Sequence, residues 1–238
     1  MYVSRFNNML ATVAASAQST ILSSSKVLTE RSPEYFKIYC DSIVEDSGYV
    51  LPDQLIAGTE LSGSHFNWCY EVAGNRQGGG EFSLSDFIIT FCGGDMNLGS
   101  ESDLQEIRSI KNELRVIDEH PETSDDQFAA FRLQGPDKMP PEIWYWNRGV
   151  IFKMNITYNQ YLDALLDLKG INYWHFLFVD IERNEYYDKY YDKAEYEHIC
   201  NKLEERINDL EFLFAKVELL KYRQLLVELT NKVSDQFD

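Results

Sequence analysis

The chain has 238 residues, of which 44% are hydrophobic and 14% aromatic, enough apolar material for one large domain or for one domain with an appendage. Its formal net charge of −17 would repel nucleic acid and anionic membranes, so we expect neither as a partner. The same charge would speed encounter with a basic protein. It is equally compatible with an acidic surface that is simply well solvated.

The N-terminal residues 1–31 are rich in Ser, Ala and Thr. An apolar run from Met9 to Ala15 follows Arg5 and loosely resembles a secretory signal, but Asn7 and Asn8 interrupt its start. We therefore predict an N-terminal helix that leads into a linker with little to bury.

The first strong helix signal is Ser32-Pro33, a hydroxyl cap followed by proline, and the helix it opens is expected to end at Gly48. Aromatic residues then alternate with others over 65–72, which predicts a half-buried strand. The glycine-rich residues 74–80 are expected to form the long loop of a hairpin whose second strand covers 81–84.

The middle of the chain mixes both kinds of element. Residues 87–91 form a short apolar run of uncertain type, Ser100 is expected to cap a helix that extends to Leu114, and residues 118–126 are expected to form an acidic loop. The pattern predicts three strands, over residues 128–133, 143–146 and 149–154, and the last two are expected to form a hairpin. Thr157 and Gln160 form a capping box that opens a helix ending at Gly170.

The C-terminal quarter is dominated by helical periodicity. Residues 174–181 have strand propensity, yet their position also allows a helix, and both assignments stay open. From about Ala194 to Val233 apolar residues recur at steps of three and four, which predicts a long helix. Its stripe, formed by Ile199, Leu203, Ile207, Leu210, Phe214 and Val217, is expected to pack onto its own domain, with a seam for a partner helix as the alternative.

We find no pattern typical of catalysis, and we predict that the protein is not an enzyme and uses no cofactor or metal. The four histidines, 65, 120, 175 and 198, are scattered without paired-ligand spacing. The run Gly78-Gly79-Gly80 lacks the lysine and hydroxyl of a phosphate-binding loop. The four cysteines form no CxxC pair, which is typical of reduced thiols in a cytoplasmic protein.

Two stretches resemble proteins of the SUKH superfamily. One is Asn67-Trp68-Cys69-Tyr70-Glu71 followed by Gly79-Gly80-Glu81-Phe82-Ser83-Leu84, which is similar to the central hairpin of that family. The other runs from Pro141-Glu142-Ile143-Trp144-Tyr145-Trp146 through the Tyr161-Leu162 pair to Gly170 and Trp174. The resemblance covers roughly residues 33–180, and neither the first 30 residues nor the C-terminal helical segment belongs to it.

The resemblance implies an α+β fold, a twisted and mainly antiparallel sheet flanked by helices, here with a long C-terminal helical extension. We accordingly divide the chain into an N-terminal helix and linker (1–31), a SUKH-like domain (32–182) and a C-terminal helical extension (183–238). Bacterial members of the family neutralise secreted toxins, often nucleases, by direct contact, and fungal relatives act as regulators and scaffolds. We therefore expect an immunity protein that binds a cognate toxin, with a SUKH-type scaffold that binds through its C-terminal helix as the alternative.

Two sets of residues follow from this expectation. Since a nuclease toxin must be basic to bind phosphates, the partner-binding surface is expected to be acidic and to comprise Asp95, Glu101, Asp103, Glu106, Asp118, Glu119, Glu122, Asp125 and Asp126. The residues expected to define the fold are Trp68, Tyr70, Gly79, Gly80, Tyr161, Gly170 and Trp174.

Overall fold

The computed structural model describes residues 1–25, 32–73, 75–94, 96–122, 126–181, 185–214 and 218–237. Its strands are β1 (Ser19–Ser24), β2 (His65–Val72), β3 (Asn75–Leu84), β4 (Leu114–Glu119), β5 (Gln127–Arg132), β6 (Glu142–Asn147) and β7 (Val150–Met154). Its longer helices are α1 (Tyr2–Ala15), α2 (Pro33–Ser47), α5 (Gln105–Glu113), α6 (Tyr158–Leu168), α8 (Lys193–Leu213) and α9 (Leu220–Phe237). Short helical turns are α3 (Asp53–Ile56), η1 (Ala57–Leu61), α4 (Phe87–Cys92), η2 (Trp174–Phe178) and α7 (Glu185–Asp188).

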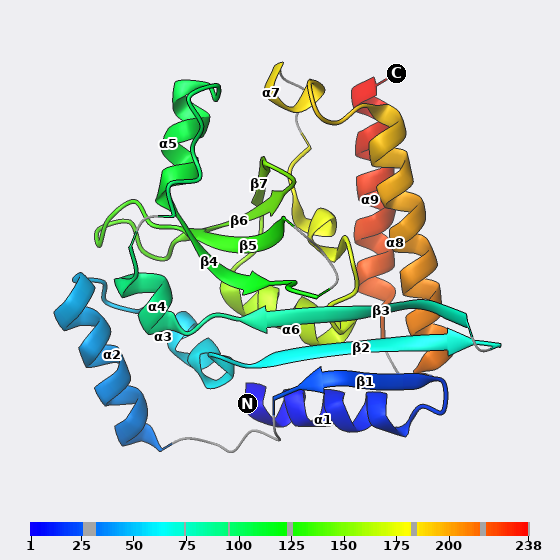
Figure 1. Ribbon diagram of the computed structural model, residues 1–238, viewed down its shortest axis with the longest axis horizontal. Coiled ribbons are helices and arrows are strands. Elements are labelled where there is room, and N and C mark those ends of the chain that lie inside the picture. The colour runs from blue at the N-terminus through cyan, green and yellow to red at the C-terminus, as the bar shows by residue number, and fades with distance from the viewer. Residues whose placement is uncertain are drawn as a thin grey trace.

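The predicted α+β class is confirmed: within the described residues, seven strands form one open antiparallel sheet in chain order, β1 to β7, with helices around it (Figure 1). The sheet narrows at one place. β3 and β4 pair only through Ser83 with Glu119 and Leu84 with Asp118, whereas β2 and β3 pair along most of their length. We call this narrow pairing the β3–β4 junction, and it divides the sheet into β1–β3 and β4–β7.

The chain after α6 connects the two parts of the sheet a second time. Ile171 forms a bridge with Gly80 of β3, and Val179 forms a bridge with Met154 of β7. Residues 169–181, which we call the return segment, therefore span from one part of the sheet to the other. The open question about 174–181 is answered by the 3-10 helix η2, which lies between these two bridges.

The glycines expected to form the hairpin loop lie inside a strand instead. β3 begins at Asn75, so Gly78, Gly79 and Gly80 all pair with β2. A side chain at Gly79 would collide with the backbone of Trp68, and one at Gly80 with the carbonyl oxygen of Lys169. These positions need glycine because backbone must approach backbone there.

The predicted N-terminal linker is wrong in part. The predicted helix is present as α1, but it buries Tyr2, Phe6 and Val13 among other side chains, and Phe6 lies 6.1 Å from Phe82 between ring centroids. The residues after it form β1, which pairs with β2 at the edge of the sheet. Short polar strands of this kind carry little periodic signal because most of their stabilisation comes from pairing.

The C-terminal segment is a helical hairpin and not one long helix. α8 ends at Leu213 and α9 begins at Leu220, and the two lie side by side (Figure 1). Their antiparallel order is set by contacts at both ends, where Arg223 binds Glu211 (2.8 Å, Nε to Oε1) and the ring of Tyr196 packs on Phe237. The predicted apolar stripe from Ile199 to Phe214 is buried, and Val217 lies outside the described residues.

The three predicted segments share one core. A single hydrophobic cluster contains Phe6 of α1, Phe82 of β3, Leu203 of α8 and Leu229 of α9. The predicted boundaries after residues 31 and 182 therefore do not separate independent cores, and both boundary residues lie outside the described part of the chain.

Several local predictions can be compared with the structure directly. The capping box of Thr157 and Gln160 is present, and the predicted strands 128–133, 143–146 and 149–154 correspond to β5, β6 and β7. The apolar run 87–91 is α4. Ser100 does not cap α5, which begins at Gln105 and has no side-chain cap.

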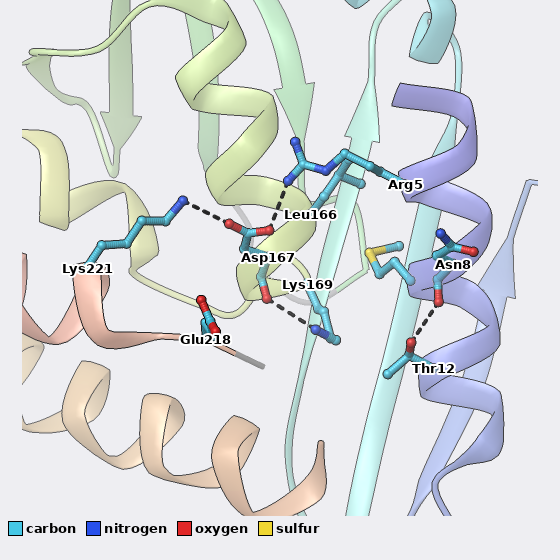
Figure 2. A pocket seen from close by; sticks show the side chains of 9 residues that line it. Arg5, Asn8, Thr12, Leu166, Asp167, Lys169, Glu218 and Lys221 are labelled. Carbon is cyan, nitrogen blue, oxygen red and sulfur yellow. Dashed lines mark hydrogen bonds and ion pairs between the residues drawn. The ribbon is translucent and has the colours of Figure 1, made fainter. Parts of the chain in front are cut away.

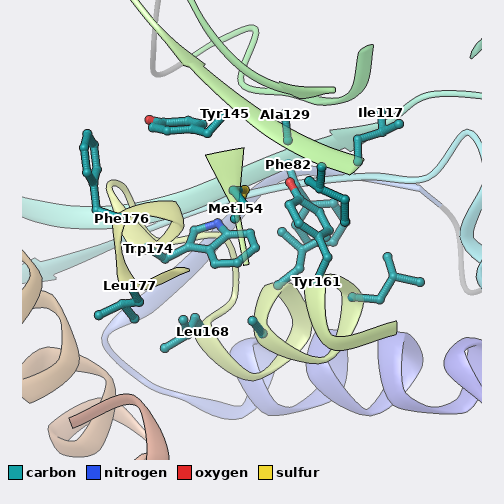
Figure 3. Packing of buried hydrophobic residues seen from close by; sticks show 14 of the residues in the cluster. Phe82, Ile117, Ala129, Tyr145, Met154, Tyr161, Leu168, Trp174, Phe176 and Leu177 are labelled. Carbon is teal, nitrogen blue, oxygen red and sulfur yellow. The ribbon is translucent and has the colours of Figure 1, made fainter. Parts of the chain in front are cut away.

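The seven residues expected to define the fold lie at or beside the core. Trp68, Tyr70, Tyr161 and Trp174 are at most 4% exposed, and Gly170 has a φ of +67° that favours glycine. Figure 3 shows Tyr161 pointing from α6 toward Phe82, and Trp174 lying beside Met154. Their role in specifying the fold stays a prediction that substitution can test.

Two remaining observations concern cysteines and membranes. All four cysteines are free thiols, and Cys69 and Cys200 are buried. Among the helices of the described residues, none combines the length and the apolar character required to span a bilayer.

Candidate functional site

The predicted acidic surface is divided by the fold into separate groups. Glu119, Glu122 and Asp126 are exposed around the turn between β4 and β5, which we call the acidic turn. Glu101 and Glu106 are exposed beside and on α5, which projects from the far end of β4 (Figure 1). Asp95 and Asp125 lie outside the described residues.

Two members of the predicted surface are buried or partly buried. Asp118 is 0% exposed, because it lies on β4 with its side chain toward the interior and not in a loop. The side chain of Asp103 is 8% exposed and forms an ion pair with the equally buried Lys111 (2.9 Å, Nζ to Oδ1). Asp118 is therefore not part of the surface, contrary to the prediction. Asp103 is partly buried and already ion-paired, and its contact with a partner stays a prediction.

The acidic turn is held in place by hydrogen bonds to buried groups. The backbone amide of Glu122 donates to both carboxylate oxygens of Glu81 (3.0 and 3.2 Å), and Asn67 donates through its side-chain amide to Glu122 (2.7 Å). At the other side of the turn, the indole of Trp146 donates to Asp126 (2.6 Å). Two of the three exposed carboxylates, Glu122 and Asp126, therefore each accept a hydrogen bond from a side chain of the sheet.

Among the described residues, no cation forms an ion pair with the carboxylates of the acidic turn. Within the described residues, Glu119, Glu122 and Asp126 form no ion pair, unlike Glu113 and Glu142, which pair with Arg132. Hydrogen bonds from Asn67 and Trp146 leave the negative charge of their acceptors intact. The turn therefore presents an exposed negative potential that a basic surface can complement.

Directly beneath the acidic turn lies a buried cluster of titratable side chains that sequence reasoning missed. Asp118, His120 and His175 are each at most 2% exposed, and one ligand atom from each lies within 4.8 Å of the others. Asp118 and His120 come from β4 and the residue after it, while His175 comes from η2 in the return segment. We call these three residues the Asp-His-His cluster.

The hydrogen bonds of the cluster pass through Asp118 and Tyr161. Asp118 accepts from the backbone amide of Ser83 (2.9 Å) and from the hydroxyl of Tyr161 (2.6 Å). The same hydroxyl lies 3.2 Å from Nε2 of His175, whose ring is stacked on Tyr145 with centroids 4.2 Å apart. Among the described residues, neither ring nitrogen of His120 nor Nδ1 of His175 has a hydrogen-bond partner.

Burial controls the protonation of all three groups. It raises the pKa of Asp118 to about 7 and lowers the pKa of His120 to about 4. It also lowers the pKa of His175 well below its ordinary value, with a further contribution from His120. At neutral pH both imidazoles are therefore uncharged, and each uncharged ring carries one nitrogen with a free lone pair.

One feature of the sequence could have pointed to this cluster. Asp118 and His120 are two positions apart, and that spacing places two side chains on the same face of a strand. The segment reads instead as a loop, because acidic residues dominate it from Asp118 to Asp126. His175 is 55 positions further along the chain, and only the fold brings it to the other two.

A separate pocket of about 480 Å³ lies between α1, the end of α6 and the start of α9 (Figure 2). Asp167 stands at its centre and binds Arg5 (2.9 Å), Lys221 (3.0 Å) and the hydroxyl of Tyr222 (2.8 Å). These bonds tie three helices together, so the charges of the pocket lining are largely satisfied within the protein.

Lys169 is the most unusual residue of this pocket. It is 4% exposed, donates to the carbonyl oxygen of Asp167 (3.2 Å) and places its ammonium 4.9 Å from the ring centroid of Phe214. Burial lowers the pKa of its ammonium to about 8, because the charged form is poorly solvated there. The other ionisable residues that line the pocket, as far as the structure describes it, are Arg5, Asp167, Glu218 and Lys221.

Comparison of the chain with models of known protein families, with curated proteins and with solved structures finds no match. The similarity to SUKH proteins therefore rests on the sequence motifs alone.

Proposed function

We propose that this protein works by binding a basic protein through the acidic turn, and that it is an immunity protein that neutralises a secreted toxin, such as a basic nuclease, by direct contact. The observation that carries the proposal is the group of exposed carboxylates, Glu119, Glu122 and Asp126, which have no ion-pair partner among the described residues and stand on a hydrogen-bonded turn. Support also comes from the SUKH-like motifs, which in bacterial relatives accompany this function.

The exposed carboxylates Glu119, Glu122 and Asp126 suit this role for two physical reasons. Opposite charge accelerates encounter, so the net charge of −17 would raise the association rate with a cationic toxin. In addition, carboxylates that are already fixed in place, as the bonds of Glu122 and Asp126 arrange here, lose little conformational entropy on binding. Affinity would still require apolar or aromatic anchors on the partner.

The test is co-purification with the product of the neighbouring gene, which encodes the toxin if the proposal is correct. In the first variant, Glu119→Lys is combined with Glu122→Gln, since glutamine can still accept the bond from Asn67. The matched control combines Glu101→Lys with Glu106→Gln and makes the same change in net charge at the far end of β4. We expect the first variant to lose the partner and the control to retain it. Equal retention by both would refute the acidic turn as the binding surface.

The alternative function, a SUKH-type scaffold that binds through its C-terminal segment, is favoured by one separate observation. Phe212, Leu220 and Val227 on α8 and α9 are 69%, 70% and 59% exposed. Leu220 and Val227 are seven positions apart and so lie on the same face of α9. Exposed apolar groups on a helical hairpin are suitable contacts for a partner helix.

Removing the whole C-terminal segment would not test this alternative cleanly, because Phe214 packs on Trp68 (5.5 Å between centroids) and Asp209 binds Tyr70. Point substitutions avoid that damage. Under the scaffold alternative, Leu220→Ser combined with Val227→Ser abolishes partner binding while the acidic-turn variant binds normally. The immunity proposal gives the opposite result.

A further inference from the structure

The Asp-His-His cluster has the composition of a metal site and lies in the interior, beneath the exposed carboxylates to which we assign the binding function. Two imidazoles and one carboxylate are ligands that suit first-row transition ions such as Zn²⁺, whereas Mg²⁺ and Ca²⁺ prefer oxygen alone. All three residues are buried, so the cluster is unlike the exposed acidic groups that occur on many surfaces.

The hydrogen bonds around Tyr161 show which atom of His175 is available. The hydroxyl of Tyr161 lies 2.6 Å from Asp118 and 3.2 Å from Nε2 of His175, so that ring nitrogen is already engaged. Nδ1 is one of the ring nitrogens that have no partner among the described residues.

His120 gives the second and independent observation. It is 2% exposed, and neither of its ring nitrogens is hydrogen-bonded to any described residue. Buried polar groups are normally satisfied, so a histidine with two unsatisfied nitrogens requires an explanation. Its ring centroid lies 5.4 Å from that of His175, which places both imidazoles beside Asp118.

We propose that Asp118, His120 and His175 bind one divalent transition-metal ion, with Zn²⁺ as the ion that fits best, at the β3–β4 junction. Two ligands of a tetrahedral zinc ion are roughly 3.3 Å apart, and the candidate atoms lie within 4.8 Å of one another. The ligand atoms must therefore come closer together by up to about 1.5 Å when the ion binds. Tyr161 and Ser83 orient the carboxylate as outer partners, a common arrangement around metal ligands.

The ion would join two parts of the fold that are far apart in the sequence. Asp118 lies on β4 and His120 directly follows it, where the pairing of β4 with β3 is only two residues long, and His175 belongs to the return segment. Three protein ligands leave one position for water, as in zinc sites that are not closed by a fourth side chain. The ion would also lie under the acidic turn and help to fix its position.

The test uses the full-length protein, stripped with a chelator and then supplied with one equivalent of Co²⁺ or Zn²⁺, both in the native state and during refolding from denaturant. Refolding is included because the cluster is buried and an ion can enter it most easily before the core closes. We expect one ion per chain, visible Co²⁺ absorption typical of tetrahedral nitrogen and oxygen ligands, and displacement of Co²⁺ by Zn²⁺. Excess Mg²⁺ should not displace it.

The decisive variant is His120→Leu, which removes the ligand without breaking any hydrogen bond to a described residue. The matched control is His198→Leu on the exposed surface of α8. We expect the first to weaken Zn²⁺ binding by more than about 100-fold and the second to leave it unchanged. Equal binding by the two variants, or no stoichiometric binding in either arm, would overturn the proposal.

If His120→Leu does not fold, the wild-type protein alone still decides the question. Of the four histidines, only His120 and His175 should show shifted side-chain ¹⁵N resonances when Zn²⁺ is added. Movement of His65 or His198 instead would indicate a surface site, and no movement would indicate that ordered water occupies the cluster. Either result would contradict the proposal.

Discussion

Asp118 and Glu119 are adjacent in one acidic run of the sequence, but the fold gives them opposite environments. Asp118 points into the protein, where Tyr161 and Ser83 bind it, while Glu119 is exposed on the acidic turn. Successive side chains of a strand point to opposite faces, so a single strand separates a buried polar cluster from an exposed charged surface. An acidic run in the sequence therefore does not by itself identify a partner surface. It must also be known whether the run forms a strand, because alternate side chains of a strand are buried.

The largest effect should come from the buried side of this comparison. Asp118→Ala leaves the hydroxyl of Tyr161 and the amide of Ser83 without their acceptor in the interior, which should lower the free energy of unfolding by about 3 kcal/mol or more. Glu119→Ala, the same kind of truncation one residue later, should change it by less than about 0.5 kcal/mol. Urea denaturation of both variants measures the two losses in the free energy of unfolding. Similar losses would contradict the opposite environments of the two carboxylates.

A smaller effect is expected where backbone approaches backbone beside the junction. Gly80→Ala adds a methyl group against the carbonyl oxygen of Lys169, so the return segment must move away from β3. We expect a loss of about 2 kcal/mol in the free energy of unfolding. Gly94→Ala is the control, because no atom of the residues that the structure describes comes within 4 Å of the added methyl group. Thermal unfolding of the two variants would show equal midpoints if the contact were unimportant.

The smallest effect concerns the return segment's buried lysine and depends on pH. Burial lowers the pKa of Lys169 from its ordinary value of 10.5 to about 8 in the folded protein, so above pH 8 the unfolded state holds more protons than the folded state. Its contribution to stability therefore rises with pH, by about 1 kcal/mol between pH 7 and 9.

Lys169→Met should remove that rise, and stability should be compared with wild type across this pH range. Lys221→Met removes a lysine of the same pocket whose side chain is 57% exposed, and it should retain the wild-type pH dependence. If the free energy of unfolding rose equally with pH in the wild type and in Lys169→Met, the burial of a charged ammonium would be contradicted.

The sequence predicted elements well where local signals agree with packing. The α+β class, the strands over 65–72 and 143–154, and the capping box of Thr157 and Gln160 are all present. In these segments alternation, turn residues and caps point to the same structure that the core stabilises.

The sequence failed where distant contacts decide the outcome. No glycine or proline lies between Leu210 and Tyr222, so nothing local marks the end of α8, which is set by burial of Phe214 against Trp68. The glycines of β3 read as a loop because the contact that requires them comes from residues 169 and 170. The Asp-His-His cluster was missed for the same reason, since His175 reaches it only through the return segment.

Association kinetics with the basic partner test the acidic turn most directly. For the wild-type protein, the association rate constant should fall by about tenfold or more as the salt concentration rises from low to physiological values. The variant that combines Glu119→Lys with Glu122→Gln should associate slowly at every salt concentration, and the variant that combines Glu101→Lys with Glu106→Gln should behave like wild type. Identical rate constants and salt dependence for both variants would contradict the assignment of partner binding to this turn.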